Sequence, residues 1–147
     1  MENMSARSVS VLMGLVAISV AVNVMAKSEN KPVETHQWVP TGIGQIEATV
    51  AYGDMNKGEH GTFLKIPKGF STPIHVHTNG YRGVVMSGTV VNSEVGQPDI
   101  PLQAGSYWFQ EGRKKHVTKC VSDTDCMVFL SQRAKFDFIE DKTNATK

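Results

Sequence analysis

Apolar and polar residues alternate in short segments along most of the chain, which is typical of β-strands whose two faces differ in environment. Gly, Pro, Asn and Asp, which favour turns, lie between these segments. No long segment repeats its apolar residues with the helical period, and the chain contains no internal repeat. Strands that recur at roughly 8–12 residue spacing with turns between them indicate an all-β sandwich or barrel.

The expected strands are short, and most are bounded by glycine or proline. The pattern places them at residues 45–52, 62–66, 74–77, 83–91 with a bend at Gly88, 102–110 and 136–139. Two further apolar segments, around His116 and Phe129, flank the turn-forming residues 121–125. We expect these two segments to pair with each other as a hairpin.

The N-terminal residues have the layout of a secretory signal peptide. Arg7 precedes an apolar run over residues 9–22, and small or modest residues at 24–26 offer a cleavage site. The alternative is an uncleaved membrane anchor, but the run is shorter than the roughly 20 apolar residues that span a bilayer. We therefore expect residues 1–26 to be removed, leaving a periplasmic or secreted protein with no stable membrane anchor.

Length and charge limit what the mature chain is. The chain has 147 residues, enough for one domain with a real core. We expect an N-terminal lead-in at 27–44, the domain itself at 45–139 and a flexible tail at 140–147. The net charge of +1 does not suggest nucleic acid as a partner. A small molecule is the expected ligand.

Cys120 and Cys126 have two interpretations. An exported chain favours a disulfide between them, across the turn of the expected hairpin. The rival interpretation makes Cys120 a metal ligand, because it lies four residues after His116 and positions i and i+4 of a strand share a face.

The histidines are the strongest candidates for chemistry. His75 and His77 are two residues apart on an expected strand, so their imidazoles point to the same side. His116 lies on a later strand, and three histidines that converge inside a barrel would form a transition-metal site. His36 lies in the lead-in and His60 in a Gly-rich loop, so we expect both to be exposed.

These histidines stand within two motifs that resemble those of the cupin superfamily. The first cupin motif is Gly, five residues, His-x-His, three or four residues, Glu, six residues, Gly. The second is Gly, five residues, Pro-x-Gly, two residues, His, three residues, Asn. The matching positions here are Gly69, His75, His77 and Gly88 in the first motif, and Gly105 and His116 in the second. The resemblance covers roughly residues 45 to 138 and implies a double-stranded β-helix, the cupin jelly-roll barrel.

The chain also departs from the cupin motifs. Tyr81 stands where the first motif has its glutamate ligand. Glu111 occupies the proline position of the second motif, Gly112 is shifted by one from its glycine, and Cys120 replaces its asparagine. The resemblance is therefore to small cupins grouped with acetylacetone-cleaving dioxygenase, which use three histidines for ferrous iron, and to a related cupin family of unassigned function.

A site without the carboxylate has physical consequences. Three neutral imidazoles leave the full charge on a divalent metal, which the resemblance identifies as Fe²⁺, although Zn²⁺, Ni²⁺, Cu²⁺ or Mn²⁺ also suit such ligands. An anionic, chelating ligand is then favoured. Arg82 either pairs with this anion or extends to the barrel rim, and Tyr81 either donates a hydrogen bond in the site or fills the core.

Other residues of the second motif region are candidates for the pocket. Gln110 is expected to line it, and by alternation either Trp108 or Phe109 should face inward as an apolar wall. The sequence assigns no catalytic residue. The motif region offers no obvious general base except Glu111, which weakens the interpretation as a hydrolase.

Two functions remain open. One is a metal-dependent enzyme, implied by the resemblance to be a non-haem iron dioxygenase acting on a small dicarbonyl or carboxylate compound. The other is a non-catalytic cupin that binds or senses a small molecule or metal. A vestigial, empty site is a third interpretation, and a homodimer is a further expectation from the resemblance.

Overall fold

The computed structural model describes residues 27–144. The expected signal peptide at 1–26 and the final residues 145–147 lie outside the described residues. Within the described part, no helix is both long enough and apolar enough to cross a membrane. Two short 3₁₀-helices, η1 (Val33–Thr35) and η2 (Lys142–Asn144), lie near the two ends of this part.

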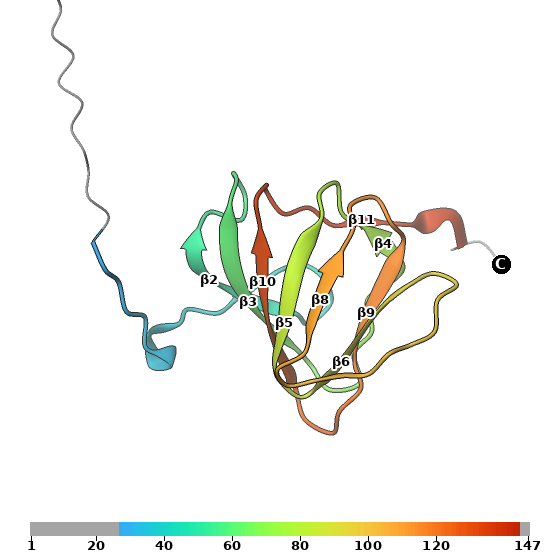
Figure 1. Cartoon of the computed structure of the whole chain (residues 1–147), viewed down its shortest axis with the longest axis horizontal. Coiled ribbons are helices and arrows are strands. Elements are labelled where there is room, and N and C mark those ends of the chain that lie inside the picture. Colours follow the sequence, from blue (N-terminus) through green and yellow to red (C-terminus); the bar gives the residue numbers. More distant parts are fainter. Residues whose placement is uncertain (1–26, 145–147) are drawn as a thin grey trace, which may run out of the picture. The chain divides into compact units, whose positions relative to one another are not determined.

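Six of the described strands form one antiparallel sheet, and the strands of this sheet that Figure 1 labels lie side by side. In spatial order they are β1 (Val39–Pro40), β2 (Glu47–Gly53), β3 (His60–Ile66), β10 (Cys126–Gln132), β5 (Tyr81–Ser87) and β8 (Tyr107–Gln110). The central strand β10 pairs with β3 along its whole length, from Cys126 opposite Ile66 to Gln132 opposite His60. Strands distant in sequence are thus neighbours in the sheet.

The remaining five described strands form the second sheet. Their order is β11 (Ile139–Glu140), β4 (His75–Val76), β9 (His116–Cys120), β6 (Thr89–Glu94) and β7 (Leu102–Gln103). The chain passes repeatedly from one sheet to the other, as in a jelly roll. The predicted all-β jelly-roll architecture is confirmed.

The core lies between the two sheets, because alternate residues of each strand face inward. Buried apolar residues come from both sheets and include Ile46, Ile66, Val85, Val90, Val128 and Leu130. Gly83 has a specific role in this packing. It lies opposite Trp108, and a Cβ at Gly83 would come within 2.1 Å of the indole ring. The glycine therefore makes room for the one large aromatic side chain that β8 turns inward.

The expected hairpin around His116 and Phe129 is wrong. Strand β9 pairs with β4 and β6, whereas β10 pairs with β3 and β5 in the other sheet. Residues 121–125 therefore carry the chain from one sheet to the other. A disulfide joins Cys120 at the end of β9 to Cys126 at the start of β10, with a Cα–Cα distance of 5.7 Å. The disulfide interpretation is correct, and the bridge closes a corner of the barrel rather than a hairpin.

The expected exposure of His60 is also wrong. His60 is 1% exposed, because β2 and β10 flank it on both sides, with Gly53 and Gln132 as its partners. Its Nδ1 and the Thr62 hydroxyl are hydrogen-bonded at 2.8 Å. Strand β3 begins earlier than its apolar pattern indicated, so the Gly-rich loop ends before this histidine.

Candidate metal centre

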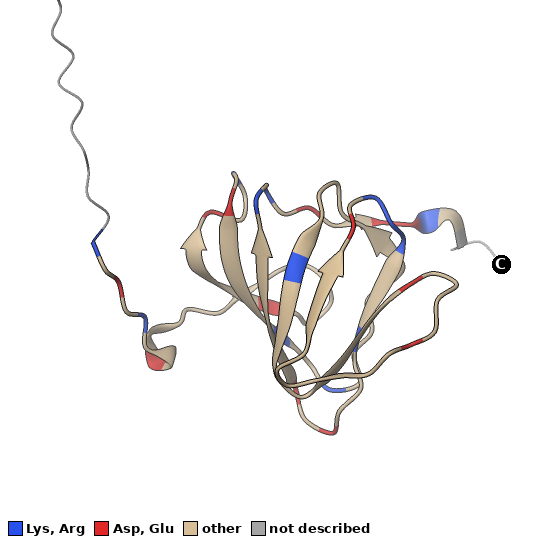
Figure 2. Ribbon diagram, in the orientation of Figure 1, with Lys and Arg blue, Asp and Glu red and all other residues tan. Residues whose placement is uncertain are grey.

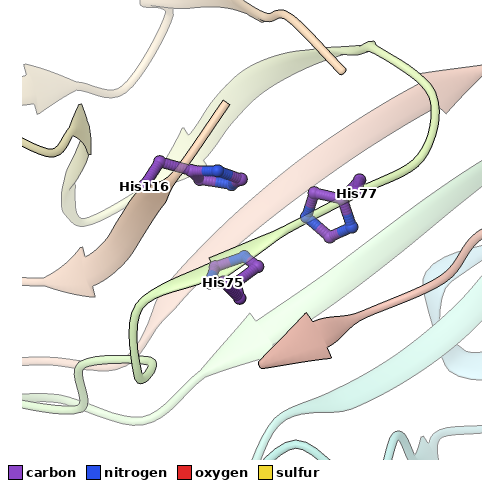
Figure 3. Close-up of side chains that lie close together, drawn as sticks. All are labelled: His75, His77 and His116. Carbon is purple, nitrogen blue, oxygen red and sulfur yellow. The ribbon is translucent and has the colours of Figure 1, made fainter. Parts of the chain in front are cut away.

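Three histidines converge inside the barrel (Figure 3). His75 begins β4, His77 directly follows it, and His116 begins the neighbouring strand β9, where it lies opposite His75. All three are buried, with exposed fractions of 2%, 4% and 0%. Each offers a ring nitrogen, and these nitrogens lie within 4.8 Å of one another. These three described histidines therefore form a cluster that could bind a metal ion.

Backbone carbonyls fix the protonation of all three rings. The Nδ1 of His75 bonds to the Pro73 carbonyl at 2.9 Å, and that of His116 to the Lys114 carbonyl at 2.9 Å. The Nδ1 of His77 bonds to the Asp137 carbonyl. A carbonyl oxygen only accepts, so Nδ1 carries the proton and Nε2 keeps its lone pair in each neutral ring. This is the arrangement that metal-binding histidines typically have.

Burial keeps these imidazoles neutral. It lowers the pKa of His75 to about 3, with the neighbouring His116 adding to the shift. Burial likewise lowers the pKa of His116 to about 4 and the pKa of His77, whose hydrogen bond to the Asp137 carbonyl opposes the shift. At neutral pH, all three rings are therefore in the form that binds metals.

Tyr81, at the position of the missing glutamate, faces the barrel interior. It is 4% exposed, and its ring centroid lies 5.1 Å from that of His77. Burial raises its pKa to about 12, so the phenol is neutral, and its hydroxyl donates to Asn92 Oδ1 at 3.2 Å. Asn92 in turn donates to Gln110 Oε1 at 2.8 Å and accepts from the Thr118 hydroxyl at 2.8 Å. A neutral polar network thus stands where cupins usually place a carboxylate.

The other sequence candidates have different positions. Gln110 is 2% exposed, but it supports this network instead of lining the pocket. Arg82 is exposed on the outer face of β5, with its guanidinium 5.5 Å from the centre of the Phe109 ring. Arg82 therefore does not reach the histidines, because alternation turns it away from the side that Tyr81 faces. Glu111 is exposed and absent from the residues that line the pocket.

An apolar pocket adjoins the cluster. Its empty volume is about 400 Å³, part of it open to solvent. Its walls include Ile46, Leu64, Trp108, Val128, Phe136 and Phe138, with His75, His77 and Tyr81 at the polar end. Of the described residues, no Lys, Arg, Asp or Glu lines it. Charged residues instead lie scattered over several strands and loops (Figure 2).

The sequence analysis missed the contribution of Phe136, Asp137 and Phe138. They follow β10, far from both motifs in the chain, yet the rings of Phe138 and Phe136 lie against candidate metal-binding histidines. Their alternating Phe-Asp-Phe pattern predicted a strand at 136–139, but strand β11 includes only the last residue of this range, and the pattern carried no signal of a metal site. Asn92 and Thr118 were also missed, because single polar residues on strands look the same whether they face water or a buried network.

Solved structures resemble this one at the level of the fold. An RmlC-like cupin protein from Ralstonia eutropha JMP134 aligns with a TM-score of 0.64 and 20% identity, over 80% of this chain and 76% of that one. An acetylacetone dioxygenase from Acinetobacter johnsonii aligns with a TM-score of 0.60 and 17% identity, over 80% and 81%. The DMSP lyase DddQ from Ruegeria pomeroyi DSS-3 aligns with a TM-score of 0.61 and 15% identity, over 76% of this chain and 64% of that one. These likenesses establish the cupin fold and leave the reaction open.

The sequence comparisons identify the family. None of the curated proteins compared with the chain matches it. A family model does match, over residues 33–142, a range that contains both histidine motifs and β11. Its description is a domain of unknown function, DUF4437. With its barrel and its three-histidine cluster, this chain therefore belongs to the DUF4437 family, a cupin-type domain of unknown function.

Proposed function

We propose that this protein is an exported, metal-dependent cupin enzyme, a non-haem iron dioxygenase acting on a small dicarbonyl or carboxylate compound. The observation that carries the proposal is the convergence of one ring nitrogen from each of three buried histidines within 4.8 Å, with each Nδ1 bonded to a backbone carbonyl. Such a tripod leaves coordination positions open, as catalytic metal sites do.

The surroundings favour an anionic, chelating substrate. Neutral imidazoles do not compensate the charge of a divalent ion, and no described charged side chain lines the pocket. Because no described carboxylate lines the pocket, the substrate itself would have to supply the negative charge, as an enolate or carboxylate does. A divalent iron held by His75, His77 and His116 would supply Lewis acidity and a site for O₂.

Export is the second part of the proposal. It rests on the layout of residues 1–26 and on the disulfide between Cys120 and Cys126, which is compatible with an oxidising compartment. The expected destination is the periplasm or the exterior of the cell.

A non-catalytic binding or sensing cupin is the alternative, and one observation favours it. Apart from the histidines, Tyr81 is the one ionisable side chain among the described pocket residues, and its raised pKa keeps it protonated, so it accepts no proton at neutral pH. A binding protein needs no proton acceptor, whereas many enzymes do.

Metal analysis tests the proposal directly. The mature protein, starting at Lys27, is purified and its metal content measured, beside a variant with His75, His77 and His116 all replaced by Ala and a His36→Ala control. We expect about one divalent metal per chain in the wild type and the control, and none in the triple variant. Oxygen consumption with β-dicarbonyl compounds then separates the enzyme from the sensor. A wild-type protein that takes up no divalent metal contradicts both the enzyme and the metal sensor.

A further inference from the structure

The segment that follows β10 passes over the metal-binding side of the barrel. We call residues 133–141 the C-terminal strap. Phe138 stacks on His75, with ring centroids 4.1 Å apart and planes inclined by 22°. Phe136 lies against His77, with a centroid distance of 5.2 Å. Both phenyl rings also line the apolar pocket. The strap thus touches two of the three candidate ligands and forms part of the pocket wall.

Asp137 holds His77 and the next residue, Thr78. Its backbone carbonyl accepts the hydrogen bond from His77 Nδ1. Its carboxylate accepts one from the backbone N–H of Thr78, the next residue, at 2.9 Å. The first bond sets which ring nitrogen is left free, and the second fixes the backbone from which the ring extends. A strap that moved would release both.

The strap is itself tied down on both sides of these contacts. At its start, the N–H of Phe136 donates to the Met55 carbonyl at 2.7 Å. At its end, β11 pairs with β4, placing Glu140 opposite His75. Beyond β11, the N–H of Asp141 donates to the Ile74 carbonyl at 2.8 Å, and its carboxylate meets Lys115 at 2.6 Å. These ties fix Phe136, Asp137 and Phe138 over the histidines.

We infer that the C-terminal strap is a positioning element of the metal centre, in which Asp137 orients His77 and Phe138 orients His75. This inference rests on the proposed metal site. It assigns a role to residues that lie outside both histidine motifs. Partners that orient metal ligands typically contribute about 10–100-fold to metal affinity.

Cobalt binding tests the role of each strap residue. Co²⁺ is titrated into the metal-free protein, and its d–d absorption reports both affinity and coordination geometry. We expect Asp137→Ala and Phe138→Leu to weaken binding by about tenfold each and to alter the spectrum. Asp137→Asn keeps an acceptor for Thr78, and Phe138→Tyr keeps the stacked ring, so both should bind within about twofold of the wild type.

Phe129→Leu is the matched control, because Phe129 is also half-buried but contacts Phe63 rather than a candidate ligand. It should leave cobalt binding unchanged. Unchanged affinity and spectra in Asp137→Ala and Phe138→Leu would overturn the inference. So would an equal loss in Phe129→Leu, which would indicate general destabilisation. An equal loss in Asp137→Asn and Asp137→Ala would show that charge, and not orientation, is what Asp137 supplies.

A metal-free measurement separates this inference from the proposed function. Nitrogen-15 NMR of the imidazoles in the apoprotein identifies the protonated ring nitrogen. We expect His77 to show a slowly exchanging Nδ1–H in the wild type. Asp137→Ala keeps the backbone carbonyl that accepts this N–H but loses the carboxylate bond to Thr78 that holds the carbonyl in place, so we expect faster exchange there. If this difference appears but no variant binds metal, the proposed function fails while the orienting role stands. If His77 is identical in both proteins, the orienting role fails.

Discussion

Arg113 and Gly112 stand at and beside the glycine position of the second cupin motif, and each meets a different backbone requirement. Arg113 stands at the motif's glycine position and has a φ of 64°, in the left-handed region that favours glycine. Its N–H donates to the His77 carbonyl at 2.7 Å, so this conformation serves the backbone beside a candidate ligand. Gly112 is needed for close approach, because a Cβ there would lie 2.7 Å from the Thr78 carbonyl oxygen.

Substitutions at these two positions should therefore act in opposite directions. Arg113→Gly should leave stability unchanged or raise it by up to about 1 kcal/mol, since it removes left-handed strain but adds freedom to the unfolded chain. Gly112→Ala should lower stability by about 1–3 kcal/mol through overpacking against the residues after His77. Urea unfolding of both variants measures this. A loss of more than about 1 kcal/mol in Arg113→Gly would show that the side chain is required.

At the scale of elements, the decisive feature is the passage from β9 to β10. The sequence around Cys120 and Cys126 has every local mark of a hairpin: two apolar strands around a polar, turn-forming segment. In the structure the two strands belong to different sheets, because β9 pairs with β4 and β6 whereas β10 pairs with β3 and β5. The same turn-forming residues suit a hairpin and a connection between two sheets, so only the pairing with distant strands distinguishes these two arrangements.

The disulfide should therefore stabilise a corner of the barrel without taking part in metal binding. Replacing both Cys120 and Cys126 by Ala should cost about 2 kcal/mol of unfolding free energy, because the bridge closes a short loop. Cobalt affinity should stay within about threefold of the wild type, since the orienting partners of His116 and the other ligands remain. Urea unfolding measures the loss of unfolding free energy, and cobalt titration measures the metal affinity. A spectrum that loses sulfur-to-cobalt charge transfer in this variant would revive Cys120 as a ligand.

At the scale of the whole molecule, the barrel interior holds an unusual number of buried histidines. His60, His75, His77 and His116 are each at most 4% exposed. Burial is the largest cause of the lowered pKa of every one of them. The interior thus keeps four imidazoles neutral, three of which form the candidate metal centre.

This burial predicts an acid-sensitive apoprotein. Each imidazole has a folded pKa below its unfolded value of about 6.5, so the unfolded state binds more protons as the pH falls. The stability is fully present above pH 6.5 or so and is lost progressively between there and the folded pKa values of about 3 for His75 and 4 for His116. Each histidine adds at most about 1.4 kcal/mol per pH unit to this slope.

Urea unfolding of the metal-free protein from pH 7.5 to 4.5 measures the effect. We expect the free energy of unfolding to fall steadily below pH 6.5, before exposed carboxylates titrate. A variant with His75→Gln and His116→Gln should show a flatter profile, because neither side chain titrates. A wild-type profile that stays level down to pH 5 would contradict the burial of these rings.

Short-range patterns in the sequence were enough to determine several features of this protein. Alternation predicted an all-β sandwich or barrel, and the His75-Val-His77 spacing predicted two imidazoles on one face. The resemblance to the cupin motifs implied the barrel and added His116. Alternation also predicted that either Trp108 or Phe109 faces inward, and in the structure Trp108 is the buried residue. These inferences succeed because side-chain direction along a strand follows from local geometry alone.

Only the tertiary structure decided which distant segments meet. It separated β9 from β10, buried His60 between β2 and β10, turned Arg82 away from the site and laid the C-terminal strap over His75 and His77. It also linked Tyr81 to Gln110 through Asn92. Such contacts depend on strand pairing across long stretches of chain, which no local periodicity encodes. The candidate ligands could thus be predicted from the sequence, whereas the residues proposed to orient them required the fold.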